Sequence, residues 1–342
     1  MKILNNYIWT EGINCEKILY HALKSFDIHH RNFEINVFVG SNFNKSDGFD
    51  NFINNNFIFH KVSKSIEKKF KYGHLGTATL WTKIIQDTNS ENFIHFDSDV
   101  IFLGEIINHI IEKLNNHDVV GPIRSYKFNP QNDDYFRKFN DTCSTCLFGF
   151  KKSKISKKYL VKNNDKILNK IYLIFMNIFK FKVSDLKISV KNLFKKNNDI
   201  LTDMILSYNP LGHKVLDAFD PVVFDIFSNG GTIDFLDFNL VGGSNSIGER
   251  KNRYPKLNDM PEKFKIEYGS KFLHFSSVGS GLYYSENINE IKVPSSYINY
   301  AVDRYNFYKY MVELDDKVLN NEKYHYFKNY TYLRKYFNYK KN

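Results

Sequence analysis

Two aspartates, one residue apart, give the sequence its strongest chemical signal. Asp97 and Asp99 follow the apolar residues 93–96 in "NFIHFDSDVIF", and this run predicts a buried strand. Residues i and i+2 of a strand point to the same face, so the two carboxylates are expected to converge. Neighbouring carboxylates repel each other unless a cation lies between them. The pair therefore predicts a divalent-cation site at the carboxyl end of a parallel strand, where open α/β sheets bind their ligands.

Segments with strand and helix patterns alternate on both sides of this pair. The alternation predicts an α/β domain over residues 1–290, with a mainly parallel sheet covered by helices on both faces. A Lys-rich stretch at about 151–198 breaks the pattern and is interpreted as a helical insertion. Residues 291–342 are interpreted as a basic, Tyr-rich helical tail. Strands are expected over 2–9, 34–42, 54–63, 92–102, 117–123, 145–150, 232–241 and 270–277, and helices from 18, over 76–87, from 106 and over 199–208.

Charge and cysteine content narrow the functional classes. The net charge of +11 favours anionic partners, but no nucleic-acid-binding motif accompanies it, so nucleic acid is not expected. Three cysteines do not form a disulfide framework, and Cys143 and Cys146 are interpreted as two buried small residues. The most apolar run, 171–179, is shorter than the ~20 residues that cross a bilayer. We therefore expect a cytoplasmic protein that is soluble or, at most, peripheral on the inner membrane surface.

The stretch "FIHFDSDVIF" resembles the DxD motif of GT-A glycosyltransferases. The resemblance implies a GT-A-like (Rossmann-like) fold, in which Asp97 and Asp99 hold Mn²⁺ or Mg²⁺ against the diphosphate of a nucleotide sugar. The later string "KFLHFSSVGSG" is similar to the His-plus-glycine element of several family branches. It implies that His274 is a third metal ligand and that residues 279–281 (Gly279, Ser280 and Gly281) approach the phosphates.

Further roles follow from the same resemblance. Lys83 lies in the helix before the DxD strand, where many members have a basic residue that contacts the donor. Asp203, in "DILTDMILSY", is similar to the acidic residue that meets the acceptor hydroxyl, although a helix-terminal Asp can also interact only with the helix dipole. The implied partners are a nucleotide-sugar donor, with UDP-sugars favoured, and a glycan or glycolipid acceptor. Apart from the resemblance, the polar, glycine-containing composition of the loop around residues 249–253 makes it a candidate lid. Asn5, Asn6 and Tyr7 are expected after the first strand, near the nucleotide base.

Other interpretations stay open at this point. The basic and aromatic tail suits contact with an anionic membrane surface, or a helical bundle that packs its Tyr faces on the core. A haloacid-dehalogenase-type phosphatase also places DxD after a buried strand, although usually near the start of the domain. A third alternative is a non-catalytic protein that binds membrane or polyanion through its basic surface.

Overall fold

The computed structural model describes residues 6–45, 49–70, 74–125 and 141–155, parts of 222–237, and parts of 267–309. Several predictions lie outside these residues: Asp203, the candidate lid at 249–253, nearly all of the helical insertion, and most of the tail. Among the described residues, no helix is long and apolar enough to cross a membrane.

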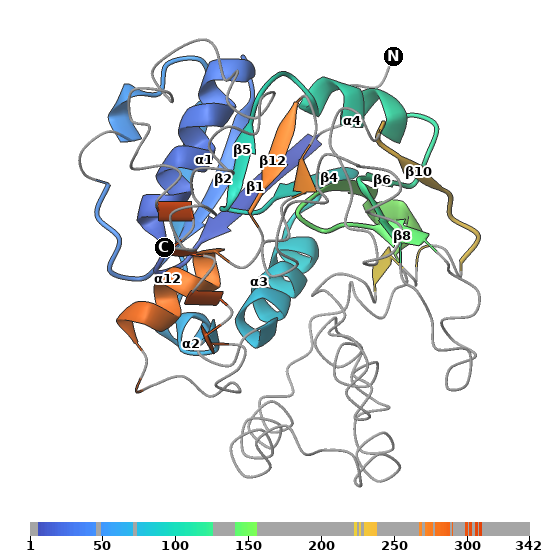
Figure 1. The fold of residues 1–342 in the computed structure, drawn as a ribbon. Coiled ribbons are helices and arrows are strands. Elements are labelled where there is room, and N and C mark those ends of the chain that lie inside the picture. Colours follow the sequence, from blue (N-terminus) through green and yellow to red (C-terminus); the bar gives the residue numbers. More distant parts are fainter. Residues whose placement is uncertain are drawn as a thin grey trace, which may run out of the picture.

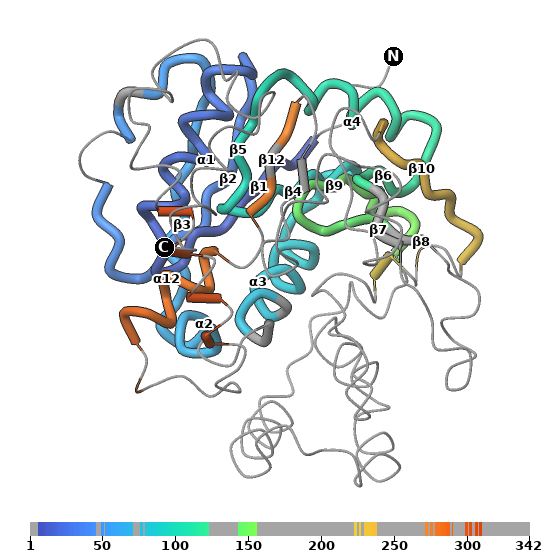
Figure 2. The backbone as a smooth tube through the Cα atoms, viewed as in Figure 1, coloured from blue at the N-terminus to red at the C-terminus, as the bar shows by residue number. Residues whose placement is uncertain are grey.

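A seven-stranded, mostly parallel sheet forms the centre of the molecule (Figure 1). Strands β3, β2, β1 and β4 are parallel neighbours in this order, β9 is antiparallel to both β4 and β6, and β10 is parallel to β6. Figure 2 shows β9 inserted between β4 and β6. The predicted α/β class with a mainly parallel sheet is therefore confirmed. The strands are β1 (Asn6–Gly12), β2 (Glu34–Val39), β3 (Asn56–Lys61), β4 (Asn92–Phe96), β6 (Val119–Gly121), β9 (Leu147–Lys151) and β10 (Ile233–Phe235).

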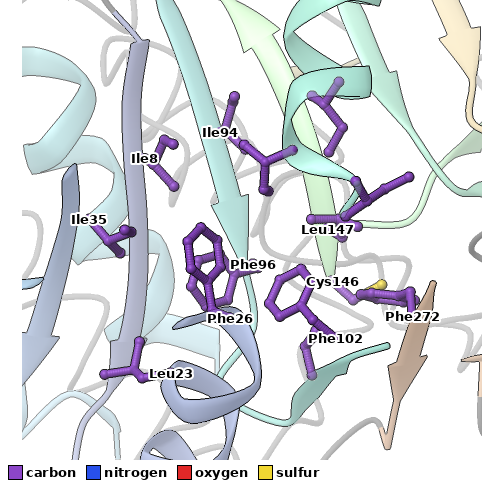
Figure 3. Close-up of a cluster of buried hydrophobic side chains, with 14 of the residues drawn as sticks. Ile8, Leu23, Phe26, Ile35, Ile94, Phe96, Phe102, Cys146, Leu147 and Phe272 are labelled. Carbon is purple, nitrogen blue, oxygen red and sulfur yellow. The ribbon is translucent and has the colours of Figure 1, made fainter. Parts of the chain in front are cut away.

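Helices cover both faces of the sheet because side chains alternate along its strands. On one face, Trp9 and Phe93 pack with α3 (His74–Asp87). On the other, Ile8 and Ile94 pack with α1 (Glu16–His29) and α4 (Ile107–Leu114). Figure 3 shows the second cluster, in which Phe26 of α1 lies against Phe96 of β4, with Phe102 close by. The helix predicted over 76–87 is confirmed, with a start two residues earlier.

A late segment of the chain returns to the end of β4. The strand β12 (Phe272–His274) pairs antiparallel with β5 (Val100–Phe102), which follows the DxD turn, and β11 (Glu267–Tyr268) pairs with β12. Figure 1 shows β12, in orange, alongside β5. The helix α12 (Val278–Glu286) follows at once. The register of β12 against β5 therefore places His274, the predicted third ligand, beside the two aspartates. The remaining short elements are β7 (Ile123–Ser125), β8 (Asp141–Cys143), α2 (Lys64–Glu67), η1 (Phe49–Asn51) and η4 (Lys152–Lys154).

The first strand lies later in the sequence than predicted. Asn6 pairs with Asn92 at the amino ends of β1 and β4, so Asn6 and Tyr7 lie at the opposite end of the sheet from Asp97. Their predicted place after the strand was wrong, and Asn5 lies outside the described residues. The predicted strand covered residues 2–9, whereas the polar residues Thr10 and Glu11 also belong to β1.

Candidate metal centre

Asp97 and Asp99 lie in the tight turn between β4 and β5. The amide of Asp97 donates to the Cys146 carbonyl at 2.8 Å, and the amide of Val100 donates back to the Asp97 carbonyl at 3.3 Å. Since the two aspartates belong to a turn, the strand alternation used to predict their convergence does not apply. They converge nonetheless, since His274 Nε2 lies within 3.5 Å of one oxygen of each aspartate.

His274 brings the two carboxylates together. Its Nε2 lies 3.5 Å from Asp97 Oδ2 and 3.3 Å from Asp99 Oδ1. One ligand atom from each of the three residues lies within 4.8 Å of the others. His274 and Asp99 are buried, whereas the Asp97 side chain is 34% exposed. This set of two hard carboxylate oxygens and one imidazole nitrogen suits a small divalent cation such as Mn²⁺ or Mg²⁺.

The start of α12 holds Asp99 in place. The Val278 amide donates to Asp99 Oδ2 at 3.0 Å, and the Phe275 amide donates to the Asp99 carbonyl at 3.1 Å. The positive end of the α12 dipole therefore lies beside the carboxylates. Asp99 is fixed from both sides, so it can bind a cation with little reorganisation.

The electrostatics of the three side chains depend on one another. Loss of water raises the pKa of Asp97 to about 6, against the lowering effect of the hydrogen bond with His274, and Asp99 raises it further. Burial alone would lower the pKa of His274, but Cys146, Asp99 and the hydrogen bonds to the two aspartates raise that pKa well above its ordinary value. The two carboxylates thus favour the protonated form of His274, and a cation bound at this place would compete with that proton.

The predicted glycine-rich segment forms the first turn of α12. A Cβ atom on Gly279 would lie 3.4 Å from Ser98 Oγ and 3.5 Å from Cys15 Sγ, so Gly279 adjoins the DxD turn. A Cβ atom on Gly281 would lie only 2.0 Å from the Ala301 carbonyl oxygen. Close packing therefore accounts for Gly281, while contact of Gly279, Ser280 and Gly281 with phosphate stays a prediction.

Lys83 lies on α3, where its side chain is 61% exposed and its Nζ lies 2.5 Å from Asp87 Oδ2. This i,i+4 pair gives the lysine a partner within its own helix. The predicted contact of Lys83 with a donor is not tested by these distances.

Sequence reasoning missed a second polar group beside Asp97. His95 is fully buried, and its Nε2 lies 2.9 Å from Glu11 Oε2 and 3.8 Å from Asp97 Oδ1. Trp81 donates from Nε1 to Glu11 Oε1 at 2.8 Å. Part of the signal was present in the sequence: His95 lies two residues before Asp97, and Glu11 lies one residue before the end of β1, the strand that also holds Trp9. The association of Glu11 with His95 is seen only when β1 is aligned with β4, in the register that places Trp9 opposite His95.

The interpretation of Cys143 and Cys146 is confirmed, since both are buried and neither forms a disulfide. Cys146 packs near Leu147 and Phe272 in the second hydrophobic cluster (Figure 3).

The sequence matches no protein-family model, and it matches no curated protein. Similar solved structures include mouse xyloside xylosyltransferase 1, with 11% identity and a TM-score of 0.37, covering 78% of this chain and 96% of that one. The glycosyltransferase GlyE of Streptococcus pneumoniae TIGR4 has 8% identity and a TM-score of 0.31, covering 69% of this chain and 46% of that one, so less than half of GlyE is matched. The 4-diphosphocytidyl-2C-methyl-D-erythritol synthase of Anaerococcus prevotii has 15% identity and a TM-score of 0.27, covering 50% of this chain and 83% of that one. Structural similarities this weak do not indicate a donor, an acceptor or a cation for this chain.

Proposed function

We propose that the chain is a metal-dependent glycosyltransferase of the GT-A type. It transfers a sugar from a nucleotide-diphosphate sugar, with UDP-sugars favoured, to a hydroxyl group of a glycan or glycolipid. The observation that carries the proposal is the meeting of Asp97, Asp99 and His274, whose ligand atoms lie within 4.8 Å of one another. These are the residues that the DxD motif and the late histidine single out in the sequence.

Asp97, Asp99 and His274 would hold the cation, with Mn²⁺ favoured over Mg²⁺ because one donor is a nitrogen. When bound, the cation supplies Lewis-acid neutralisation of the departing nucleoside diphosphate. The chain itself supplies preorganisation, because the Val278 amide fixes Asp99. The positive end of α12 at the same place favours phosphate.

The remaining roles belong to the proposal as well. Lys83, Gly279, Ser280 and Gly281 contact the donor diphosphate, and Asp203 meets the acceptor hydroxyl. Residues 249–253 close over the donor, and the tail binds an anionic membrane surface. The resemblance to GT-A transferases supports the roles of Lys83, residues 279–281 and Asp203, whereas the lid and the membrane contact are supported only by the composition of their segments.

The test is donor binding followed by thermal unfolding and by assay of nucleotide release. With Mn²⁺ and a nucleotide at about 100 times its Kd, stabilisation of about 2.7 kcal/mol is expected, which raises the midpoint by roughly 4 °C for a chain of this length. Asp97→Asn and Asp99→Asn should remove this shift. Asp50→Asn, which removes an exposed carboxylate paired with Lys45, is the matched control and should keep it. If UDP, GDP and CMP all leave the midpoint unchanged with Mn²⁺ present, the proposal is rejected.

Two controls separate this reaction from others that use similar groups. Hydrolysis of p-nitrophenyl phosphate, abolished by Asp97→Asn, would instead indicate a phosphatase. Formation of a nucleotide sugar from UTP and a sugar 1-phosphate would indicate a nucleotidyltransferase. A glycosyltransferase should show neither activity and should release UDP from a UDP-sugar.

A further inference from the structure

A late part of the chain packs against the elements that hold Asp99. The described residues between 298 and 309 are helical, and we call them the tail segment. Figure 1 shows them, in red, beside α12. Ala301 and Tyr308 of this segment are buried, with 0% and 3% exposed. The tail segment therefore contributes to the core around α12.

The first contact joins the tail segment to Gly281 of α12. A Cβ atom on Gly281 would lie 2.0 Å from the Ala301 carbonyl oxygen and 2.8 Å from Tyr305 Cβ, whereas ordinary Cβ contacts begin at 3.4 Å. Gly281 lies one turn after Val278, whose amide donates to Asp99 Oδ2 at 3.0 Å. The absence of a side chain at Gly281 therefore lets the tail segment approach the turn of α12 that holds Asp99.

The second contact joins the tail segment to the residue that follows His274. The rings of Tyr308 and Phe275 lie 5.0 Å apart between centroids, at an angle of 86°. Aromatic pairs prefer this edge-to-face arrangement. The amide of Phe275 donates to the Asp99 carbonyl oxygen at 3.1 Å. The tail segment thus contacts the chain on both sides of Val278, and both contacts lie next to a hydrogen bond to Asp99.

We propose that Gly281 and Tyr308 are positioning residues for Asp99. They fix the tail segment against residues 275–281, and these contacts keep the amides of Phe275 and Val278 on Asp99. The inference rests on the proposed function, because it takes Asp99 as a cation ligand. Groups that hold the ligands of a metal site commonly change metal affinity by about 10- to 100-fold when they are altered.

Gly281→Ala tests the first contact by adding one methyl group. The methyl group requires α12 and the tail segment to separate by on the order of 1 Å, since overpacking is relieved by backbone shifts. If α12 moves, the amide of Val278 leaves hydrogen-bonding distance of Asp99. If the tail segment moves instead, Tyr308 leaves Phe275.

Mn²⁺ binding without nucleotide is the measurement for this variant. We expect Gly281→Ala to bind Mn²⁺ on the order of 10-fold more weakly than the wild type, with an altered Mn²⁺ EPR line shape. Gly281 is also proposed to contact the donor diphosphate, but a contact with phosphate cannot change Mn²⁺ binding when no nucleotide is present. The absence of nucleotide therefore separates the two roles.

Variants of Tyr308 test the second contact. Tyr308→Leu removes the ring that packs on Phe275 and should weaken Mn²⁺ binding on the order of 3-fold, the size of one aromatic pair. Tyr308→Phe keeps the ring and should bind Mn²⁺ as the wild type does. Tyr20→Leu is the matched control, because the ring of Tyr20 packs on Phe49 and Phe52 at 5.4 and 5.7 Å. It should lower the unfolding midpoint without changing Mn²⁺ affinity.

The outcomes are distinct. Unchanged Mn²⁺ affinity and line shape in Gly281→Ala and Tyr308→Leu would overturn the positioning role and leave the proposed function standing. An equal loss of affinity in Tyr20→Leu would also overturn it, because any loss of stability would then have the same effect. A wild-type protein that binds no Mn²⁺ would overturn both proposals. If Gly281→Ala does not fold, the comparison of Tyr308→Leu with Tyr308→Phe decides the question.

Discussion

Two buried histidines in different regions of the molecule show how partners, rather than burial, set the charge of a side chain. His30, at the end of α1, donates from Nδ1 to the Phe26 carbonyl at 3.1 Å and accepts at Nε2 from the Ile106 amide at 3.2 Å. One donor and one acceptor make it neutral, and burial lowers its pKa to about 3. His274, on β12, is similarly buried but faces two carboxylates, and its pKa is raised well above the ordinary value.

The difference separates a structural region from one suited to chemistry. His30 satisfies backbone groups and joins α1 to the start of α4. His274 lies instead within 3.5 Å of an oxygen of each of two carboxylates that the chain places side by side. A cluster of buried charged side chains lowers the stability of a protein when no cation is bound. Such clusters are typical of functional sites.

The largest effect is expected from replacing His274. In His274→Gln the proposed site loses its nitrogen ligand, and Mn²⁺ affinity should fall at least about 100-fold, measured by isothermal titration calorimetry. His30→Gln is the control for loss of a buried histidine and should bind Mn²⁺ as the wild type does. If the Mn²⁺ affinity of His274→Gln stays within about 3-fold of the wild-type affinity, His274 is not a ligand. The contrast drawn between His274 and His30 is then wrong.

A strong pH dependence of Mn²⁺ binding is the next effect. The pKa of His274 is raised, so below that pKa the ring is protonated and a cation must displace the proton. The apparent affinity should therefore fall about 10-fold per pH unit as the pH decreases. Asp97, with its pKa raised to about 6, steepens the decline below pH 6. Calorimetry in buffers of different ionisation enthalpy should detect the released proton, and affinity independent of pH would contradict the assignment.

A smaller effect is expected on stability at His30. Because the pKa of His30 is lowered to about 3, the unfolded state takes up a proton before the folded state as the pH falls below about 6.5. The contribution of His30 to the free energy of unfolding therefore falls by about 1.4 kcal/mol per pH unit between about pH 6.5 and about pH 3. At pH 7.5, His30→Leu should lose about 1–3 kcal/mol because the buried Ile106 amide loses its acceptor. Urea unfolding should show that this difference shrinks at pH 5. A constant difference would mean that His30 is not held neutral.

The smallest effect is expected at Lys83. Its ion pair with Asp87 is exposed, so Lys83→Gln should change the free energy of unfolding by no more than about 0.5 kcal/mol. Measured in the same variant, UDP affinity with Mn²⁺ present decides the predicted phosphate contact. Unchanged UDP affinity would remove Lys83 from the donor site.

The sequence allowed the domain class and the central residues to be predicted, because they depend on local pattern. Apolar periodicity located α1, α3 and β4, and the DxD spacing located Asp97 and Asp99. Their convergence was expected from strand geometry, but it comes from a turn. The polar end of β1 was misplaced because a strand that enters a site carries Thr10 and Glu11 where a buried strand would carry apolar residues. Glu11 and His95 were missed since their association depends on the register of β1 against β4, which no local pattern encodes.

The most direct test of the central claim is anomalous diffraction at the manganese absorption edge from crystals soaked with Mn²⁺ and UDP. We expect one anomalous peak, bound by Asp97, Asp99 and His274 and in contact with the diphosphate. A peak bound elsewhere, or no peak in crystals that contain UDP, would contradict it.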